Sequence, residues 1–391
     1  MTVGRGDGPA PEAPGRFAGP PSTAGDDRRP GLGTDLSRRL GVDLPVFGFS
    51  HAVDVVVALC NAGGIGVLGA TRMTPDEITA ALAAIRARVD DRPFGVDLVL
   101  PRGMPEHDDR AAIEAGIPDA HRAFVADLAA RYGVPAPEGP GARSRFVRSE
   151  ETAARQIDAV LASDVDLFAM GIGSPPAAVA GAKAEGKLIV SLVGRPVHAR
   201  RAVESGADIV VAQGYDAGAH TGTIGTYSLV PQVVDAVSPV PVLAAGGVAT
   251  GRHVAAALAM GAQGVWIGTA WLVAAEAHTD PIVLARLLAA GSDDTVISRA
   301  DSGKTLRQVR TAWSDEWARP EAVEPLRMPY QDILVGDLLG AIEQHRVEAL
   351  MHSPAGQGIA YFDRPTTVAG VLAQLVEEAR AALARLGGNP G

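Results

Sequence analysis

His220 is the residue of this 391-residue chain whose surroundings best suit acid–base chemistry. An imidazole titrates near neutrality, so it can take a proton from carbon or stabilise a developing negative charge. His220 lies in the glycine-rich run QGYDAGAHTG, directly after an apolar run at 208–213. Loops that follow strands hold the ligands of α/β folds. This position favours a catalytic role for His220 over the structural role that a lone histidine usually has, with Tyr215 and Asp216 placed to orient it or to shape its pocket.

Two further glycine-bearing segments are typical of a phosphate-binding site. The apolar run 240–245 leads into Gly246 and Gly247, and the run 264–268 ends at Gly268, which Thr269 follows. Both precede expected helix starts, where backbone N–H groups favour an anion. The last two strands of a (β/α)8 barrel commonly supply such a site. These four residues are therefore predicted to cradle a phosphate, although adjacent glycines also suit a tight turn.

Eight short apolar runs alternate with amphipathic segments of helical period. The runs are 44–49, 64–69, 94–100, 165–170, 187–193, 208–213, 240–245 and 264–268. Runs of this length, rich in Val and Ile and bounded by turn residues, suit buried parallel strands. Eight of them alternating with helices predict an α/β fold of the closed (β/α)8 TIM-barrel type rather than an open doubly wound sheet. The run GIGVLG has the spacing of a dinucleotide-binding loop but continues as a strand, so that fingerprint is absent.

The segments around the barrel differ in composition. Residues 1–33 are dominated by Gly and Pro, and their low apolar content predicts a disordered extension. The barrel is expected over 34–290. An insertion at 101–150, after the third strand, suits a lid or a substrate wall, although its charged residues are also typical of a solvated surface. Residues 291–391 are expected to form a mostly helical C-terminal extension with a structural role.

Composition excludes several classes of protein. The net charge of −10 argues against a nucleic-acid-binding surface, and no apolar run reaches the roughly 20 residues of a membrane span. The only cysteine, Cys60, has small apolar neighbours and is predicted to fill core space, so no internal disulfide or thiolate zinc site is available. No His and carboxylate cluster has the spacing of metal ligands. The N-terminus lacks the apolar core of a secretory signal, which favours the cytoplasm. The oligomeric state stays open, a homodimer included.

The runs QGYDAGAHTG, LVPQVVDAV and PVLAAGGVATGRHVAAALAMGAQGVWIGT resemble the nitronate monooxygenase family, formerly called 2-nitropropane dioxygenases, which are FMN-dependent barrels. The N-A-G-G-x-G run at 61–66 is similar to the family's as well. The resemblance implies that FMN is the cofactor, that a small molecule and O2 are the substrates, and that His220 is the catalytic histidine. The residues expected to bind the cofactor are Phe49, Asp97, Gln213, Gly218, Gly246, Gly247, Gly268 and Thr269.

Three positions depart from the family pattern. Ala219 replaces the second glycine of A-G-G-H, which matters if that backbone takes a positive φ. Asp97 stands where the family more often has asparagine, and an ionised carboxylate there would disfavour an anionic reduced flavin. Phe49 lies where many members have Ala-Pro-Met, and it either covers a face of the flavin ring or belongs to the core. Gln213 is expected at the polar edge of the flavin.

The resemblance implies oxidation of alkyl nitronates with O2 to carbonyl compounds and nitrite. With neutral nitroalkanes, His220 would first remove the acidic α-proton. One alternative is an FMN-dependent NAD(P)H oxidoreductase of the enoyl-thioester reductase or quinone reductase type, because the same flavin barrel serves all of them. Another alternative, of a different class, is a barrel that binds a phosphate ligand without redox chemistry.

Overall fold

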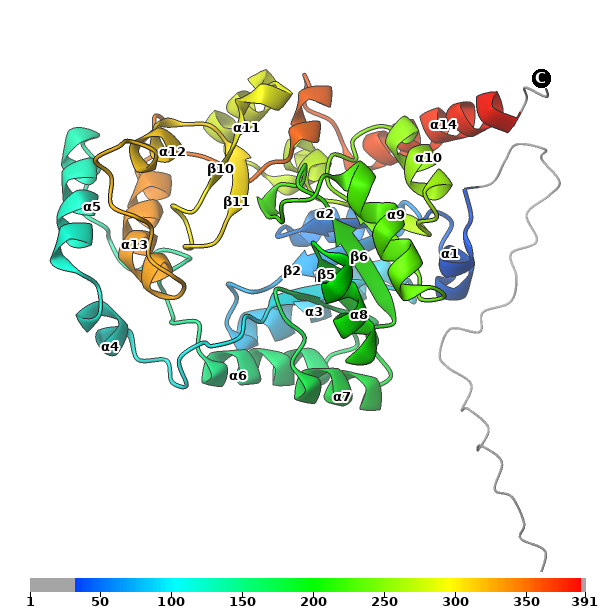
Figure 1. Ribbon diagram of the computed structural model, residues 1–391, viewed down its shortest axis with the longest axis horizontal. Helices are drawn as coiled ribbons and strands as arrows, with labels where there is room; N and C mark the ends of the chain where they lie inside the picture. The colour runs from blue at the N-terminus through cyan, green and yellow to red at the C-terminus, as the bar shows by residue number, and fades with distance from the viewer. Residues whose placement is uncertain (1–31, 388–391) are drawn as a thin grey trace, which may run out of the picture.

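The computed structural model describes residues 32–387, and a closed barrel of eight parallel strands lies at its centre (Figure 1). The barrel strands are β1 (Val46–Ser50), β2 (Ile65–Gly69), β3 (Gly95–Val99), β4 (Leu167–Gly171), β5 (Leu188–Val193), β6 (Ile209–Gln213), β8 (Val242–Ala245) and β9 (Gly264–Ile267). They follow one another round the barrel in chain order, and β9 closes it by pairing with β1. The predicted (β/α)8 barrel is confirmed, and each strand begins and ends within about two residues of its predicted run.

Helices cover the outside of the barrel between successive strands (Figure 1). They are α2 (Val53–Asn61), α3 (Pro75–Val89), α6 (Glu150–Leu161), α7 (Pro176–Ala184), α8 (Pro196–Glu204), α9 (Thr226–Val237) and α10 (Gly251–Ala259). Helix α3 begins with a capping box, in which Thr74 and Glu77 exchange hydrogen bonds of 2.8 and 3.3 Å. Ser174, whose residue type and position suit a helix cap, does not cap α7. Its hydroxyl lies 3.1 Å from that of Ser191 on β5, and Pro175 precedes α7 instead.

The barrel strands bury both of their faces. Inward-facing residues such as Val67, Val190 and Val211 fill the barrel interior, and Leu36 of helix α1 (Asp35–Leu40) belongs to the same apolar cluster. The outward-facing residues pack beneath the helices in a larger cluster that contains Cys60. Burial raises the pKa of the Cys60 thiol to about 11, so this side chain is an inert core residue, as predicted.

The insertion and the C-terminal extension form a second packed unit beside the barrel (Figure 1). The insertion contributes α4 (Arg110–Ala115) and α5 (Asp119–Arg131), and both contact α13 (Tyr330–Gln344). Leu128 of α5 shares a buried apolar cluster with Trp313 of α12 (Ala312–Trp317). The insertion is thus fixed against the extension by apolar burial. Helix α14 (Val368–Gly387) returns to the barrel and packs on α10.

The extension contains more than the expected helices. Strands β10 (Thr295–Ser298) and β11 (Leu306–Val309) form an antiparallel pair, and β11 also pairs with the two-residue strand β7 (Ala219–His220). The helix expected after the last barrel strand is broken into the 3₁₀ turns Thr269–Val273 and Ala275–Ala277 and helix α11 (Pro281–Ala289).

Leu32, which precedes the predicted start of the barrel unit, is buried in the large apolar cluster. The rest of the predicted disordered extension, residues 1–31, lies outside the described residues. Between residues 32 and 387, no helix is both long and apolar enough to cross a membrane.

Candidate active site

A cavity of about 1420 Å³ opens at the end of the barrel where the strands terminate. Its lining includes Arg143 from the insertion and Lys304 and His352 from the extension, so both appended segments form part of its wall. The structure brings together the predicted catalytic and cofactor-binding residues, and each of them lines this one cavity, whereas Tyr215 and Asp216, expected to orient His220 or to shape its pocket, do not line it. The predicted residues that line it are Phe49, Asp97, Gln213, Gly218, His220, Gly246, Gly247, Gly268 and Thr269. Because the carboxyl ends of parallel strands meet at one end of a barrel, residues far apart in sequence converge there.

The backbone around His220 is held by the C-terminal extension. In the small sheet, His220 pairs with Leu306 and Ala219 pairs with Arg307. The Gln213 side chain donates from its Nε2 to the carbonyl oxygen of His220. Gln213 therefore holds the loop that carries His220 through its amide nitrogen. Its amide oxygen remains available to a ligand in the cavity. The sequence did not reveal this pairing, because a two-residue strand has no periodic pattern.

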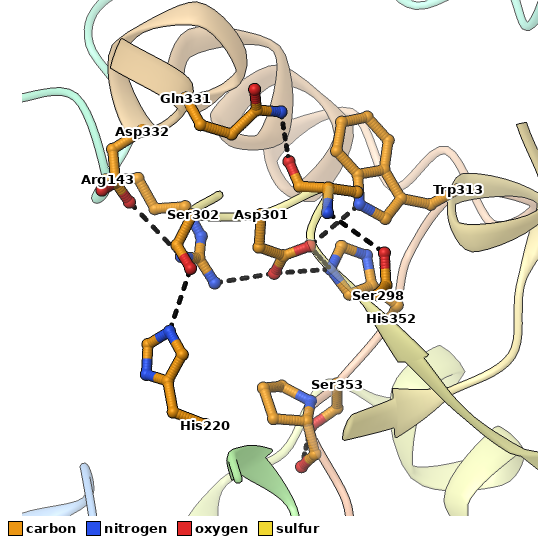
Figure 2. A network of polar contacts seen from close by, with 12 residues as sticks. Arg143, His220, Ser298, Asp301, Ser302, Trp313, Gln331, Asp332, His352 and Ser353 are labelled. Atoms are coloured by element: carbon orange, nitrogen blue, oxygen red, sulfur yellow. Dashed lines mark hydrogen bonds and ion pairs between the residues drawn. The ribbon is translucent and has the colours of Figure 1, made fainter. Parts of the chain in front are cut away.

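The His220 imidazole is held in a positive environment. Its Nε2 lies 2.9 Å from the Ser302 hydroxyl (Figure 2). Burial and the nearby positive charges lower the pKa of His220 to about 3. The charged side chains responsible are Arg148, Arg143, Arg72 and Lys304. His220 is therefore a neutral imidazole at any working pH, and the surrounding cations favour negative charge on whatever lies beside it.

A buried polar network fixes the loop that carries Ser302 (Figure 2). The Asp301 carboxylate accepts hydrogen bonds from Arg143 Nη2 at 2.8 Å, Trp313 Nε1 at 2.9 Å and His352 Nε2 at 3.1 Å. Although burial acts in the opposite direction, the charges of His352 and Arg143 hold the pKa of Asp301 well below its usual range. Asp301 is thus an ionised anchor for the loop. The sequence offered only the short polar run RADSGKT as a signal for these residues.

The glycines of the predicted phosphate cradle have different structural requirements. Gly246 and Gly247 take positive φ values of 101° and 70°, and a Cβ on Gly246 would lie 2.6 Å from Thr226 Oγ1. Both positions therefore need glycine. Gly268 has a φ of −121°, and the nearest atoms to a Cβ there would be 3.9 Å away on Phe49. Thr269 accepts a 2.9 Å hydrogen bond at Oγ1 from the Gly356 backbone.

Asp97 is a buried carboxyl group at the edge of the cavity. Its Oδ1 has no hydrogen-bond partner among the described residues, and burial raises its pKa to about 7. A buried polar atom without a partner costs free energy unless a ligand supplies one. Asp97 is therefore suited to contact the polar edge of a bound ligand, and near neutrality its protonated form can donate as an asparagine would.

Asp97→Asn should change how stability depends on pH. The pKa of Asp97 is raised from its ordinary value of 3.8 to about 7, so the folded protein holds a proton that the unfolded chain has lost. Stability contributed by this group is present below about pH 4 and is lost as the pH rises to 7, on the order of 4 kcal/mol in total. Thermal unfolding between pH 5 and 8 should show Asp97→Asn more stable than wild type at pH 8, with a gap that shrinks as the pH falls. A gap independent of pH would contradict this assignment.

Ala219, which stands where the family has glycine, has a positive φ. Its φ is +58°, in the region that favours glycine, and its methyl group is exposed. Ala219→Gly should therefore stabilise the protein by about 1 kcal/mol, because it removes strain and loses no packing. The measurement is the free energy of unfolding in urea. Ala217→Gly is the matched control, since Ala217 is buried without a positive φ and should lose stability. Destabilisation by Ala219→Gly would mean that the strain is absent.

Phe49 and Gly218 occupy the cavity wall for identifiable packing reasons. Phe49 stacks on Trp266 with 6.2 Å between ring centroids and meets the edge of His51 at 5.2 Å. A Cβ on Gly218 would lie 2.7 Å from the Gly356 backbone nitrogen, so glycine lets the histidine loop approach the extension. Within the described part of the chain, no three His, Cys, Asp or Glu side chains are grouped so as to hold a metal ion.

Comparisons with known proteins agree with this arrangement. The family model described as nitronate monooxygenase matches residues 42–378. A Mycobacterium tuberculosis protein named as a monooxygenase is 42% identical, over 88% of this chain and 96% of its own. An indene-carboxyl-CoA dehydrogenase of the same organism is 31% identical, over 72% of this chain and 67% of its own. The structure of a nitroalkane oxidase from Streptomyces ansochromogenes has a TM-score of 0.75 and 27% identity, covering 88% of this chain and 98% of that one. The chain belongs to the nitronate monooxygenase family.

Proposed function

We propose that this protein is an FMN-dependent nitronate monooxygenase that oxidises alkyl nitronates with O2 to carbonyl compounds and nitrite. The observation that carries the proposal is the position of His220, at the family's histidine position and surrounded by positive charges in the barrel cavity. A nitronate is an anion, so this field favours its binding. Membership of an oxidoreductase family removes the alternative of a barrel without redox chemistry.

The cavity fits FMN on three counts. The paired glycines at 246–247 give the backbone the positive φ needed to turn N–H groups toward a phosphate, and 268–269 adjoin them because β8 and β9 are neighbours. The unpaired Oδ1 of Asp97 suits the polar edge of the flavin ring. Phe49 lies on β1, between β9 and β3 in the order of the barrel, and so between these two regions of the wall. When bound, the flavin would supply the electron acceptor that the oxidation needs.

The side chains of the protein have separate tasks in this proposal. The arginines near His220 bind and orient the anionic substrate. His220 hydrogen-bonds to it and, for a neutral nitroalkane, accepts the α-proton at its imidazole. The low pKa leaves the imidazole in its basic form, and the positive field that lowers the pKa also stabilises the nitronate as it forms. Ser302 orients the ring from the Nε2 side.

The absorption spectrum of the purified protein tests the cofactor, and steady-state rates test the reaction. We expect a yellow protein with a flavin spectrum that turns over an alkyl nitronate with O2 and oxidises NADH or NADPH slowly. Rapid NADH or NADPH oxidation without nitronate turnover would instead support a flavin-dependent reductase of thioesters or quinones. The relative named as a CoA-thioester dehydrogenase makes CoA thioesters the first substrates to try in that case.

A further inference from the structure

The predicted phosphate cradle continues into helix α10 through residues 248–250, at a point where backbone N–H groups need an acceptor. The N–H groups at the start of a helix have no acceptor within the helix itself. Here they converge on one side chain, because the Nδ1 atom of His253 lies 3.3 Å from Ala249 N and 3.2 Å from Thr250 N. The Thr250 hydroxyl lies 3.1 Å from the same atom. His253 therefore holds the segment that joins the cradle to the helix.

These hydrogen bonds require a neutral His253 with a lone pair on Nδ1. Burial lowers the pKa of His253 below its ordinary 6.5, and the charge of Arg252 lowers it further, whereas the charge of Glu378 on α14 raises it. The Glu378 carboxylate accepts from the next donor along the chain, Gly251 N, at 2.8 Å. The ring of Tyr361 meets the imidazole at 83°, with 5.3 Å between the ring centroids. The ring is thus neutral near pH 7, and a proton on Nδ1 would remove the acceptor from both backbone N–H groups.

The cradle depends on the direction of its backbone N–H groups. Its segments 246–250 and 268–270 contain no lysine or arginine, so the attraction for a phosphate comes from those N–H groups. Only Val248 separates Gly247 from Ala249 in the chain. A movement of the Ala249 N–H group therefore turns the peptide groups on either side of Gly247.

We propose that His253 is a positioning residue of the phosphate site: its neutral Nδ1 atom holds residues 249–250 so that the cradle directs its N–H groups at the phosphate of FMN, and protonation of the ring releases them. The proposal rests on the proposed function, which supplies FMN as the ligand. His253 is the third residue of α10 after the cap Thr250. Glu or Gln usually accepts from the cap N–H at this position. Histidine differs from both because it titrates near neutrality.

The first test compares the affinity of the flavin-free protein for FMN with its affinity for riboflavin, which lacks the phosphate. His253→Leu should bind FMN about 10-fold more weakly than wild type does and riboflavin equally well, because only the phosphate end loses contacts. His253→Gln should keep the wild-type preference for FMN, since its amide oxygen accepts the same N–H group. An unchanged preference in His253→Leu, or one in His253→Gln as low as in His253→Leu, would overturn the proposal.

Thr74→Ala is the matched control for a loosened helix start. Thr74 caps α3 by accepting from Glu77 N at 3.3 Å, and it does not line the cavity. Loss of this cap should lower the melting temperature by a few degrees, as loss of the His253 acceptor should. The preference for FMN over riboflavin should stay at the wild-type value. A preference that falls as far in Thr74→Ala as in His253→Leu would mean that general loosening weakens the site, and the proposal would fail.

Acid should weaken FMN binding to wild type more than to His253→Gln. The pKa of His253 is lowered from 6.5, so its hydrogen bonds are intact above that pH and are lost as the pH falls through the lowered pKa. The phosphate of FMN also gains a proton near about pH 6, but it does so with both proteins. The ratio of the two dissociation constants should be near one at pH 8 and rise several-fold by pH 5. A constant ratio, or tighter binding to wild type in acid through attraction by the charged ring, would contradict the proposal.

Hydrogen exchange in the flavin-free protein tests the role of His253 in the loop without any ligand. At pH 7 the amides of Ala249 and Thr250 should exchange about 10-fold faster in His253→Leu than in wild type and at the wild-type rate in His253→Gln. Equal exchange in all three proteins would overturn the proposal. If the exchange rates differ as expected but no protein binds FMN at any pH, the proposed function fails and the hold of His253 on the loop stands.

Discussion

Replacing His220 with asparagine is expected to reduce turnover of a neutral nitroalkane by about 10²- to 10⁴-fold, the usual effect of removing a general base. Turnover of a pre-formed nitronate should fall much less, because that substrate has already lost its proton. Bound flavin should remain, since Gly246, Gly247 and Gly268 lie on other loops. The measurement is kcat/KM for both substrates at equal flavin occupancy. Equal losses on the two substrates would assign His220 a binding or electrostatic role.

The pH profile gives an independent check on the same residue. His220 has a pKa of about 3 and acts as a base in its neutral form. Activity that depends on it should therefore rise near that pH, and in Asp97→Asn, which removes the cavity carboxyl group with a pKa of about 7, the profile should show no inflection between pH 6 and 8. His51→Asn is the matched control. His51 lines the same cavity and its Nδ1 lies 2.8 Å from the Gly69 carbonyl oxygen, so this change should leave the ratio of the two substrates in place.

Gly247→Val is expected to yield protein without flavin. Gly247 has a φ of +70°, and a Cβ there would already lie 3.3 Å from the Asp216 side chain. A β-branched residue would force the backbone away from this conformation and turn its N–H group from the phosphate. The ratio of flavin to protein absorbance measures the loss. Full flavin occupancy in Gly247→Val would show that the phosphate binds elsewhere.

Gly186→Val separates loss of the site from simple backbone strain. Gly186 also has a φ of +70°, lies after helix α7 away from the cavity lining, and has no atom within 4 Å of a built Cβ. It carries the same conformational penalty as Gly247 without a ligand nearby. This control should therefore lose stability to a similar degree and keep its flavin.

The sequence by itself determined the barrel and most of its mouth. Continuous apolar runs bounded by glycine define buried parallel strands locally, and a parallel barrel brings the ends of such strands to one place. For that reason Asp97, His220 and Gly246 could be assigned to one cavity without coordinates, and the structure confirms that they line it. Thr74 could be assigned as a cap because its partner lies three residues away.

The tertiary structure decided what depends on contacts between distant segments. Ser174 has the sequence of a cap, but its hydroxyl hydrogen-bonds to that of Ser191 on the neighbouring strand β5. The strand that carries His220 exists because β11 pairs with it, and Ser302 reaches the imidazole from 82 residues away. Likewise, nothing in the loop after β2 indicates that the pKa of Arg72 is lowered, and it is the insertion that brings the charges of Arg143 and Arg148 near it. Local sequence patterns specify helices and strands. The pKa of a charged side chain and its ion pairs depend on neighbours that only the folded chain brings close to it.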